Sequence, residues 1–268
     1  MTAQPVDRFA ECIAPANWQA VDVISDLHLQ AGEPETFEAW AAYLRRPAHE
    51  RADALFILGD LFEVWVGDDV LSTHTSPSAD HAFWRACAEA LQAYSAHAPV
   101  YFMAGNRDFL LGPAGLDACG MQGLSDPTVL VFLDQRWLLS HGDALCLEDT
   151  EYLRFRAQVR TPEWQQALLA RPLEERRTLA RSVRAQSEDR KRSPDMVWAD
   201  VDADAARDWL RQAGATCLVH GHTHRPAIHD LGDGMRRIVL SDWDAAAHPP
   251  RAQLLCLSSA GAQRVDLR

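Results

Sequence analysis

Five short polar segments of the chain contain side chains of the kinds that bind metal ions. They are residues 25–29, 59–63, 105–108, 140–143 and 221–226, and together they offer Asp, His and Asn. Each segment directly follows an apolar run, and the ends of neighbouring strands in α/β proteins deliver side chains into a shared cleft. We therefore expect the five segments to meet at one site.

Two pairs of residues in these segments are spaced so that both members can bind one cation. Asp26 and His28 are two residues apart, and so are His222 and His224. On an extended chain, side chains two residues apart point to the same face. Asp60 is not part of such a pair, but its two carboxylate oxygens can bridge two ions. We expect one ion to be bound by Asp26, His28, Asp60 and His224, and its neighbour by Asp60, Asn106, His141 and His222.

This ligand set predicts a particular chemistry. Carboxylate, imidazole and amide ligands without thiolate favour Mn, Fe or Zn. Two ions about 3.5–4 Å apart can activate a water molecule for in-line attack on phosphorus and can neutralise the charge that develops. Arg107 adds a guanidinium beside Asn106, where it can stabilise the same oxygens. The sequence therefore predicts hydrolysis of a phosphate ester or anhydride, with Arg107, Asn106 and His141 as catalytic residues.

The composition limits the class of protein. The chain has 268 residues, of which 47% are hydrophobic and 24% are charged, and its formal net charge is -12. An acidic bulk argues against a nucleic-acid partner, which needs a basic face. The six cysteines are scattered, as expected in a reducing cytosol. No apolar stretch is long enough to span a bilayer, and residues 1–22 lack the apolar core of a signal peptide.

Apolar runs that alternate with helical patterns predict the elements that position the five segments. Strands are expected at 21–25, 54–58 and 100–104, with helices at 34–45 and 79–97 between them, which is the pattern of βαβ units. Shorter strands are expected farther on, at 129–133, 136–140, 216–220, 227–231, 237–240 and 253–257. We expect an α/β sandwich of two mixed β-sheets flanked by helices.

The strand pattern stops between residues 143 and 216, where several helices are expected. We therefore expect residues 1–147 and 214–268 to form the core domain. Residues 148–213 are expected to form an inserted helical lid.

The expected lid differs from the rest of the chain in charge. Residues 151–192 contain 11 Arg and Lys against 6 Asp and Glu. These basic side chains could contact substrate phosphate or anionic lipid, or they could simply face solvent. Five side chains of the lid have helical spacing and could line a slot for acyl chains or pack the lid onto the body: Tyr152, Phe155, Val159, Trp164 and Leu168.

The order and form of the five segments resemble a known family. The pattern Asp-x-His, Gly-Asp, Gly-Asn, His-Gly and Gly-His-x-His is that of the calcineurin-like metallophosphoesterases, and here it spans residues 20–242. Generic members have His after the Gly-Asn, whereas this chain has Arg107. Together with segments 59–69, 141–146 and 221–226, Arg107 makes the chain similar to the UDP-2,3-diacylglucosamine hydrolase family.

The resemblance implies an enzyme of lipid A biosynthesis, and hence of lipopolysaccharide formation. Members of that family hydrolyse the pyrophosphate of UDP-2,3-diacylglucosamine to UMP and 2,3-diacylglucosamine 1-phosphate, known as lipid X. Their cofactor is a pair of Mn²⁺ ions, and other divalent metals can serve. The resemblance also implies a peripheral protein on the cytoplasmic face of the inner membrane, and we expect a monomer.

By the same resemblance, the substrate contacts outside the metals fall on Asn106, Arg107, Asp149, Ser187 and His222. The family pattern continues past Ser187 with Asn and then Lys, and an ungapped match puts Lys191 and Pro194 there. Because Lys191 is the only lysine of the chain, we include it among the expected substrate contacts. This departure concerns the lid and leaves the metal centre unaffected.

Two alternatives remain open. The same metal centre could act on another substrate, as in a nucleotide pyrophosphatase or a phosphoprotein phosphatase. A non-catalytic scaffold could also have this fold, although all seven expected ligand positions hold competent side chains. Arg107 and the long helical insertion weigh against the first alternative, and metal content tests the second.

Overall fold

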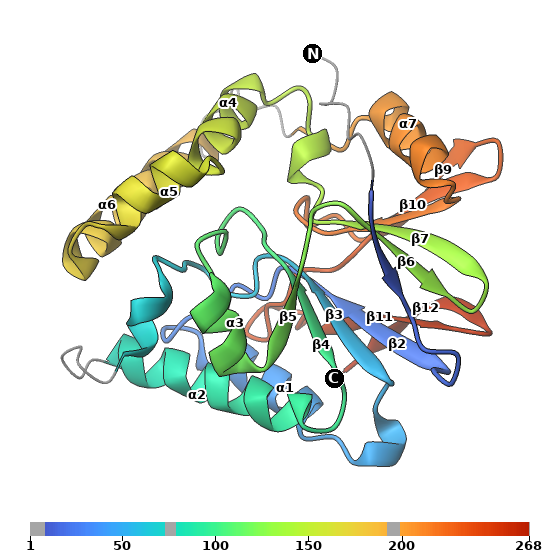
Figure 1. The fold of residues 1–268 in the computed structure, drawn as a ribbon, viewed down its shortest axis with the longest axis horizontal. Coiled ribbons are helices and arrows are strands. Elements are labelled where there is room, and N and C mark those ends of the chain that lie inside the picture. The colour runs from blue at the N-terminus through green and yellow to red at the C-terminus, as the bar shows by residue number, and fades with distance from the viewer. Residues whose placement is uncertain (1–8, 73–78, 192–198, 268) are drawn as a thin grey trace.

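The strands of the protein form two mixed β-sheets of six strands each. The structure is a computed structural model and describes residues 9–72, 79–191 and 199–267. Helices cover the outer faces of both sheets (Figure 1). The expected α/β sandwich of two mixed sheets flanked by helices is confirmed.

The first sheet has the spatial order β1-β6-β7-β8-β10-β9. Its strands are β1 (Ala10–Ile13), β6 (Thr128–Phe132), β7 (Gln135–Ser140), β8 (Cys217–His220), β10 (Met235–Val239) and β9 (Ala227–Gly232). The β6–β7 and β10–β9 pairs are antiparallel and the other pairs are parallel.

The second sheet has the spatial order β12-β11-β2-β3-β4-β5. Its strands are β12 (Gly261–Asp266), β11 (Gln253–Ser258), β2 (Ala20–Ile24), β3 (Ala54–Leu58), β4 (Val100–Met103) and β5 (Met121–Leu124). The four strands from β2 to β5 are mutually parallel, whereas β11 is antiparallel to both of its neighbours. The carboxyl ends of β2 to β5 therefore lie at one edge of the sheet.

Side chains alternate along each strand between two apolar cores. Phe56 of β3 and Leu139 of β7 lie in the core between the sheets. The next residue along β3, Ile57, faces a core that the sheet shares with helices, and Leu138 of β7 does the same in the other sheet. The molecule is therefore layered as helix, sheet, sheet and helix.

The helices fall into three groups. Their bounds are α1 (Pro34–Leu44), α2 (Ala79–Ser95), α3 (Pro113–Cys119), α4 (Thr150–Val159), α5 (Pro162–Leu169), α6 (Leu173–Lys191) and α7 (Ala203–Ala213), with short 3₁₀ turns η1 (Ala48–Glu50), η2 (Asp68–Leu71) and η3 (Asp143–Leu145). Figure 1 shows α1 to α3 across the second sheet, α7 on the first sheet, and α4 to α6 set apart from both. Among the described residues, no helix combines the length and apolar character needed to cross a membrane.

Helix α7 lies inside the range 148–213 expected for the lid, yet it packs against the first sheet. Its buried face includes Trp209 and Leu210, which share a core with Leu138 and Leu218. Apolar residues at helical spacing bind it to the body in the same way as α1 and α2. The helices that stand apart from the sheets are α4, α5 and α6.

Candidate active site

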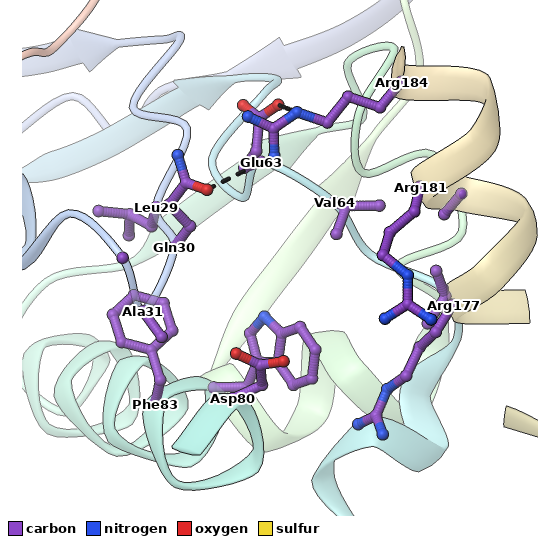
Figure 2. A pocket seen from close by; sticks show the side chains of 14 residues that line it. Leu29, Gln30, Ala31, Glu63, Val64, Asp80, Phe83, Arg177, Arg181 and Arg184 are labelled. Carbon is purple, nitrogen blue, oxygen red and sulfur yellow. Dashed lines mark hydrogen bonds and ion pairs between the residues drawn. The ribbon is translucent and has the colours of Figure 1, made fainter. Parts of the chain in front are cut away.

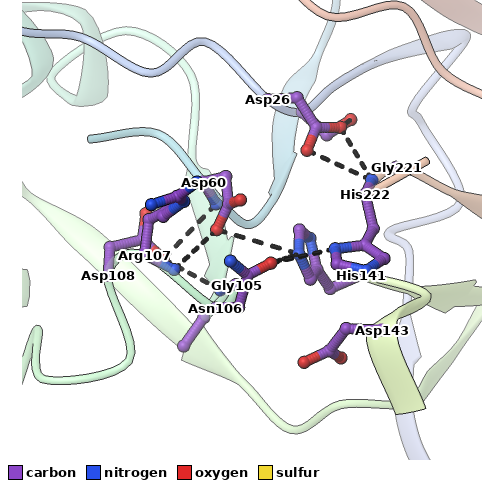
Figure 3. A network of polar contacts seen from close by, with 12 residues as sticks. Asp26, Asp60, Gly105, Asn106, Arg107, Asp108, His141, Asp143, Gly221 and His222 are labelled. Atoms are coloured by element: carbon purple, nitrogen blue, oxygen red, sulfur yellow. Dashed lines mark hydrogen bonds and ion pairs between the residues drawn. The ribbon is translucent and has the colours of Figure 1, made fainter. Parts of the chain in front are cut away.

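The expected metal ligands all lie at the carboxyl ends of parallel strands. Asp26 and His28 follow β2, Asp60 follows β3, and Asn106 follows β4. In the first sheet, His141 follows β7, and His222 and His224 follow β8. Figure 3 shows that these loops from the two sheets meet, with polar contacts joining their side chains. The structure therefore brings all seven residues into one place.

One group of side chains gathers around His28 and His224. Their Nε2 atoms are 3.2 Å apart. His224 Nε2 lies 3.4 Å from Asp26 Oδ1, and His28 Nε2 lies 3.9 Å from Asp60 Oδ2. Two ring nitrogens that face each other beside two carboxylates suit a shared cation.

A second group gathers around the side-chain oxygen of Asn106. His222 Nδ1 is 2.9 Å from Asn106 Oδ1, and His141 Nε2 is 3.0 Å from it. His141 Nε2 also lies 3.7 Å from Asp60 Oδ1. Asp60 therefore turns one carboxylate oxygen toward each group, as a bridging ligand does.

The donor atoms fit divalent cations in number, kind and spacing. One ligand atom from each of Asp26, His28 and His224 lies within 4.8 Å of the others, and the same holds for Asp26, Asp60 and His141. The donors are nitrogen and oxygen, which suit first-row divalent metals. Asp26, Asp60 and His141 are buried, whereas His224 is exposed, so the site opens to solvent at His224.

The backbone at the site is left-handed at five of the seven residues. The φ angles are 54° at Asp26, 49° at His28, 52° at Asp60, 66° at His222 and 52° at His224. The expectation that the Asp26/His28 and His222/His224 pairs lie on extended chain is therefore wrong. Residues other than glycine rarely adopt this conformation, and such strained residues gather at functional sites.

Two glycines allow the loops to approach this closely. A Cβ on Gly105 would lie 2.1 Å from Asp60 Oδ1, and one on Gly221 would lie 2.2 Å from Asp26 Oδ2. No side chain can be placed at either distance, so glycine is required where the β4 loop meets the β3 loop and where the β8 loop meets the β2 loop.

Asp108 is a structural residue of the site to which sequence reasoning assigned no role. Its buried carboxylate accepts hydrogen bonds from the backbone N–H groups of Gly105 (2.8 Å) and Leu61 (2.7 Å), with longer ones from Asp60 and Phe62. It therefore joins the loops that follow β3 and β4. Only its position two residues after Asn106 could have drawn attention to it.

Glu63 fixes the orientation of His28. Its Oε2 is 2.7 Å from His28 Nδ1, which leaves His28 Nε2 free to face the site. Its Oε1 lies 3.6 Å from the Arg107 guanidinium and 3.2 Å from that of Arg184 in α6. A carboxylate on the far nitrogen of a ligand histidine is a common support in metal centres.

Comparison with known proteins identifies the family. The calcineurin-like phosphoesterase family matches residues 20–226. The chain belongs to this family. It is 44% identical over 257 residues to the UDP-2,3-diacylglucosamine hydrolase of Chromobacterium violaceum, covering 92% of this chain and 99% of that protein. It is also 44% identical to the enzyme of the same name from Chromohalobacter salexigens, covering 82% of this chain and 87% of that protein.

An archaeal phosphodiesterase superimposes with a TM-score of 0.46 at 10% identity, covering 92% of this chain and 99% of that one.

Charges at close range shift the pKa values in the centre of this phosphoesterase. Burial alone would lower the pKa of His141, but Asp60 and its neighbouring carboxylates outweigh burial and raise the pKa to about 9. Burial and the nearby His141 lower the pKa of His222 to about 4. Burial acts to raise the pKa of Asp26, yet hydrogen bonding to His224 and the surrounding imidazoles lower it overall. The carboxylates thus favour the protonated form of His141, whereas burial and the charge of His141 favour the neutral form of His222.

Helix α4 is attached to the site through buried ion pairs. Arg156 donates from Nε to Asp143 Oδ2 at 2.8 Å, and its Nη2 lies 3.3 Å from Asp126 Oδ2. Asp126 in turn accepts a hydrogen bond from the backbone N–H of His141 at 3.3 Å. The ring of Tyr152 stacks on His222 with 5.9 Å between centroids. The helix therefore contacts the first sheet next to two of the candidate ligands.

Of the remaining expected substrate contacts, one lies beside the site, one caps a helix, and two have side chains outside the described residues. Arg107 is half-buried, and its backbone N–H donates to Asp60 Oδ1 at 2.8 Å, so its side chain is held beside the site. Asp149 caps α4 by accepting from the N–H of Tyr152 at 3.0 Å. Ser187 and Lys191 lie in α6, and their side chains, like all of Pro194, lie outside the described part of the structure.

Proposed function

We propose that the protein hydrolyses the pyrophosphate bond of UDP-2,3-diacylglucosamine, releasing UMP and 2,3-diacylglucosamine 1-phosphate (lipid X) in lipid A biosynthesis. The observation that supports this most is the position of Asp60, which turns one carboxylate oxygen toward each of two ligand groups. The close relatives that bear the name of this hydrolase support the choice of substrate.

Seven side chains are proposed to hold two Mn²⁺ ions: Asp26, His28, Asp60, Asn106, His141, His222 and His224. When bound, the ions supply Lewis acidity, which activates a water molecule and neutralises charge on the phosphoryl oxygens. The chain holds the ligands ready in a strained backbone braced by Asp108 and Glu63, so little rearrangement is needed during the reaction.

Arg107 is proposed to bind the pyrophosphate oxygens. Its guanidinium lies 3.6 Å from Glu63 Oε1, and Glu63 also contacts His28, so the cation is held at the edge of the ligand cluster. A fixed, permanently charged fork can stabilise the oxygens of a phosphoryl group as charge develops. Asn106 and His222 are proposed to contact the same group, and Asp149, Ser187 and Lys191 to contact the rest of the substrate.

Helices α4 to α6 are proposed to be the lid, and their exposed apolar side chains to meet the lipid. Phe155, Leu169, Leu179 and Val183 are between 37% and 41% exposed, and all four belong to these three helices. Together with the arginines of the same helices, they suit acyl chains and the anionic cytoplasmic face of the inner membrane. We propose a peripheral protein at that surface.

The test is release of UMP from UDP-2,3-diacylglucosamine in detergent by purified protein loaded with Mn²⁺. Asp60→Asn is the matched inactive control, and Asp117→Asn, at an exposed site, is the active one. Faster turnover of UDP-glucosamine without acyl chains, or of a phosphopeptide, would assign the centre to another substrate. Lack of any bound transition metal after incubation would favour a scaffold.

A further inference from the structure

A cavity of about 190 Å³ lies beside the metal-ligand cluster, between α2, α6 and the loops that follow β2 and β3. Figure 2 shows its walls, with arginines from α6 facing the loop of Gln30 and the aromatic side of α2. Glu63 borders both the metal-ligand cluster and the cavity, because its Oε2 contacts His28 while its Oε1 contacts Arg184. The cavity therefore begins one side chain away from a candidate metal ligand.

The walls combine aromatic surface with positive charge, and the carboxylates of Glu63 and Asp80 also line the cavity. Phe83 and Trp84 of α2 form one side. Arg177, Arg181 and Arg184, spaced along one face of α6, form the other. A ligand that fits must offer a flat apolar face together with hydrogen-bond acceptors.

Arg177 offers this cavity hydrogen-bond donors that a ligand could satisfy. Its Nε and Nη2 are buried and have no hydrogen-bond partner among the described residues. The guanidinium lies 5.5 Å from the centre of the Trp84 ring, and only its Nη1 pairs with a carboxylate, that of Glu174. Buried donors without partners are unfavourable unless a ligand or water accepts from them.

We propose that this cavity binds the uridine of the substrate, with the uracil ring against the aromatic wall and its carbonyl oxygens accepting from Arg177 and Arg181. This inference rests on the proposed function, because it takes UDP-diacylglucosamine as the substrate. The pyrophosphate, next to the uridine, then lies at the ligand cluster on the far side of Glu63.

The acyl chains have a different place available. Leu179 and Val183 are exposed and lie on another face of α6, roughly 150° around the helix from the arginines at 100° per residue. Hydrocarbon cannot accept from guanidinium N–H groups, so acyl chains in the cavity would leave Arg177 unsatisfied. The two faces of α6 thus separate the two ends of the substrate.

The test compares UMP with ribose 5-phosphate, which lacks the base, as ligands of the Mn²⁺-loaded protein by calorimetry. The unchanged protein should bind UMP more tightly by about tenfold or more, as expected for charge-assisted hydrogen bonds. Arg177→Met and Arg181→Ala should each remove most of this preference. Arg171→Ala, which removes the same charge from an exposed site outside the cavity, should keep it.

Turnover provides a second measurement. The selectivity for UDP-diacylglucosamine over bis(p-nitrophenyl) phosphate should fall about tenfold in the two cavity variants, in proportion to their loss of UMP preference. Equal binding of UMP and ribose 5-phosphate by the unchanged protein would overturn the inference, as would a preference that survives both substitutions. The inference would also be overturned if the two cavity variants changed only the dependence of turnover on acyl length.

Failure of the proposed function gives a different result. A protein that releases no UMP from UDP-diacylglucosamine, yet prefers UMP over ribose 5-phosphate through Arg177 and Arg181, would refute the substrate and support the cavity assignment. Normal UMP release without that preference would refute the cavity assignment alone.

Discussion

The candidate metal ligand His28 has the carboxylate of Glu63 at its second ring nitrogen. Glu63 Oε2 lies 2.7 Å from His28 Nδ1, and this ion pair determines which ring nitrogen faces the site. Glu63 is largely buried, and its pKa is held below the usual range because the contacts with His28 and the nearby guanidinium groups outweigh the effect of burial. An ionised Glu63 therefore both orients His28 and increases its basicity.

Replacing Glu63 by glutamine should weaken metal binding. The amide keeps the shape but loses the charge, so we expect a loss of about 10- to 100-fold in Mn²⁺ affinity. Titration of the metal-free protein with Mn²⁺ measures it, with Glu163→Gln, on the exposed surface of α5, as the matched control. Equal affinity in the two variants would show that His28 needs no such support.

Asp108 stabilises the loops themselves. Its carboxylate accepts from four backbone N–H groups, and these donors have no alternative partner in a buried place. In Asp108→Ala the donors lose their acceptor, so we expect the free energy of unfolding to fall by about 3 kcal/mol. Urea denaturation measures this, with Asp117→Ala as the exposed control. A loss no greater than that of the control would contradict the role given to Asp108.

The residues of the site differ in how far the sequence predicts them. The seven expected ligands have a signal, because each is a polar residue of a metal-binding type directly after an apolar run. Asp108 has only its place two residues after Asn106, because three of the four N–H groups that donate to it come from a loop distant in the sequence. The left-handed conformation of Asp26 and His28 is likewise set by contacts between loops distant in the sequence, such as the hydrogen bond from the Asp26 N–H to the Gly59 carbonyl.

At the scale of elements, apolar patterning predicts the central strands and misses several edge strands. The strands β2, β3 and β4 appear where continuous apolar runs place them. The strands β1, β5 and β12 lie at sheet edges, and their half-exposed sequences show little apolar patterning. Edge strands have only one neighbour, so pairing rather than burial determines them.

The sequence also does not predict how α4 is attached, because the charged side chains that attach it come together only in the folded chain. Arg156 is the shared cation of Asp126 and Asp143. Burial acts to raise the pKa of Asp143, but Arg156 and nearby basic groups outweigh it and keep that pKa far below its usual range. The carboxylate therefore stays charged and needs its partner.

Arg156→Met should loosen α4. Removing one member of a buried ion pair leaves the others uncompensated, at a cost of about 3–5 kcal/mol. We expect faster amide hydrogen exchange in α4 and a lower free energy of unfolding, and partial recovery of both when Asp143→Asn is added. Arg154→Met, at an exposed site of the same helix, is the control. Unchanged exchange in α4 would show that other contacts hold the helix.

At the scale of the whole molecule, the site lies where the two sheets meet. Asp26, Asp60 and Asn106 come from the loops of one sheet, and His141 and His222 come from the other. A cation bound by both sets joins the two halves of the sandwich. Such a cation binds the folded chain but not the unfolded chain, which has no assembled site. Binding therefore stabilises the fold.

Removing metal should therefore lower the melting temperature of the whole protein. At a free Mn²⁺ concentration of 100 times Kd, binding at one site stabilises by about 2.7 kcal/mol. Each kcal/mol corresponds to about 2–4 °C for a chain somewhat smaller than this one, so EDTA should lower Tm by several degrees and Mn²⁺ should restore it. In Asp60→Asn the response should shrink, because the carboxylate that faces both ligand groups is lost. An equal Mn²⁺ response in that variant would mean that the stabilising cation binds elsewhere on this acidic surface.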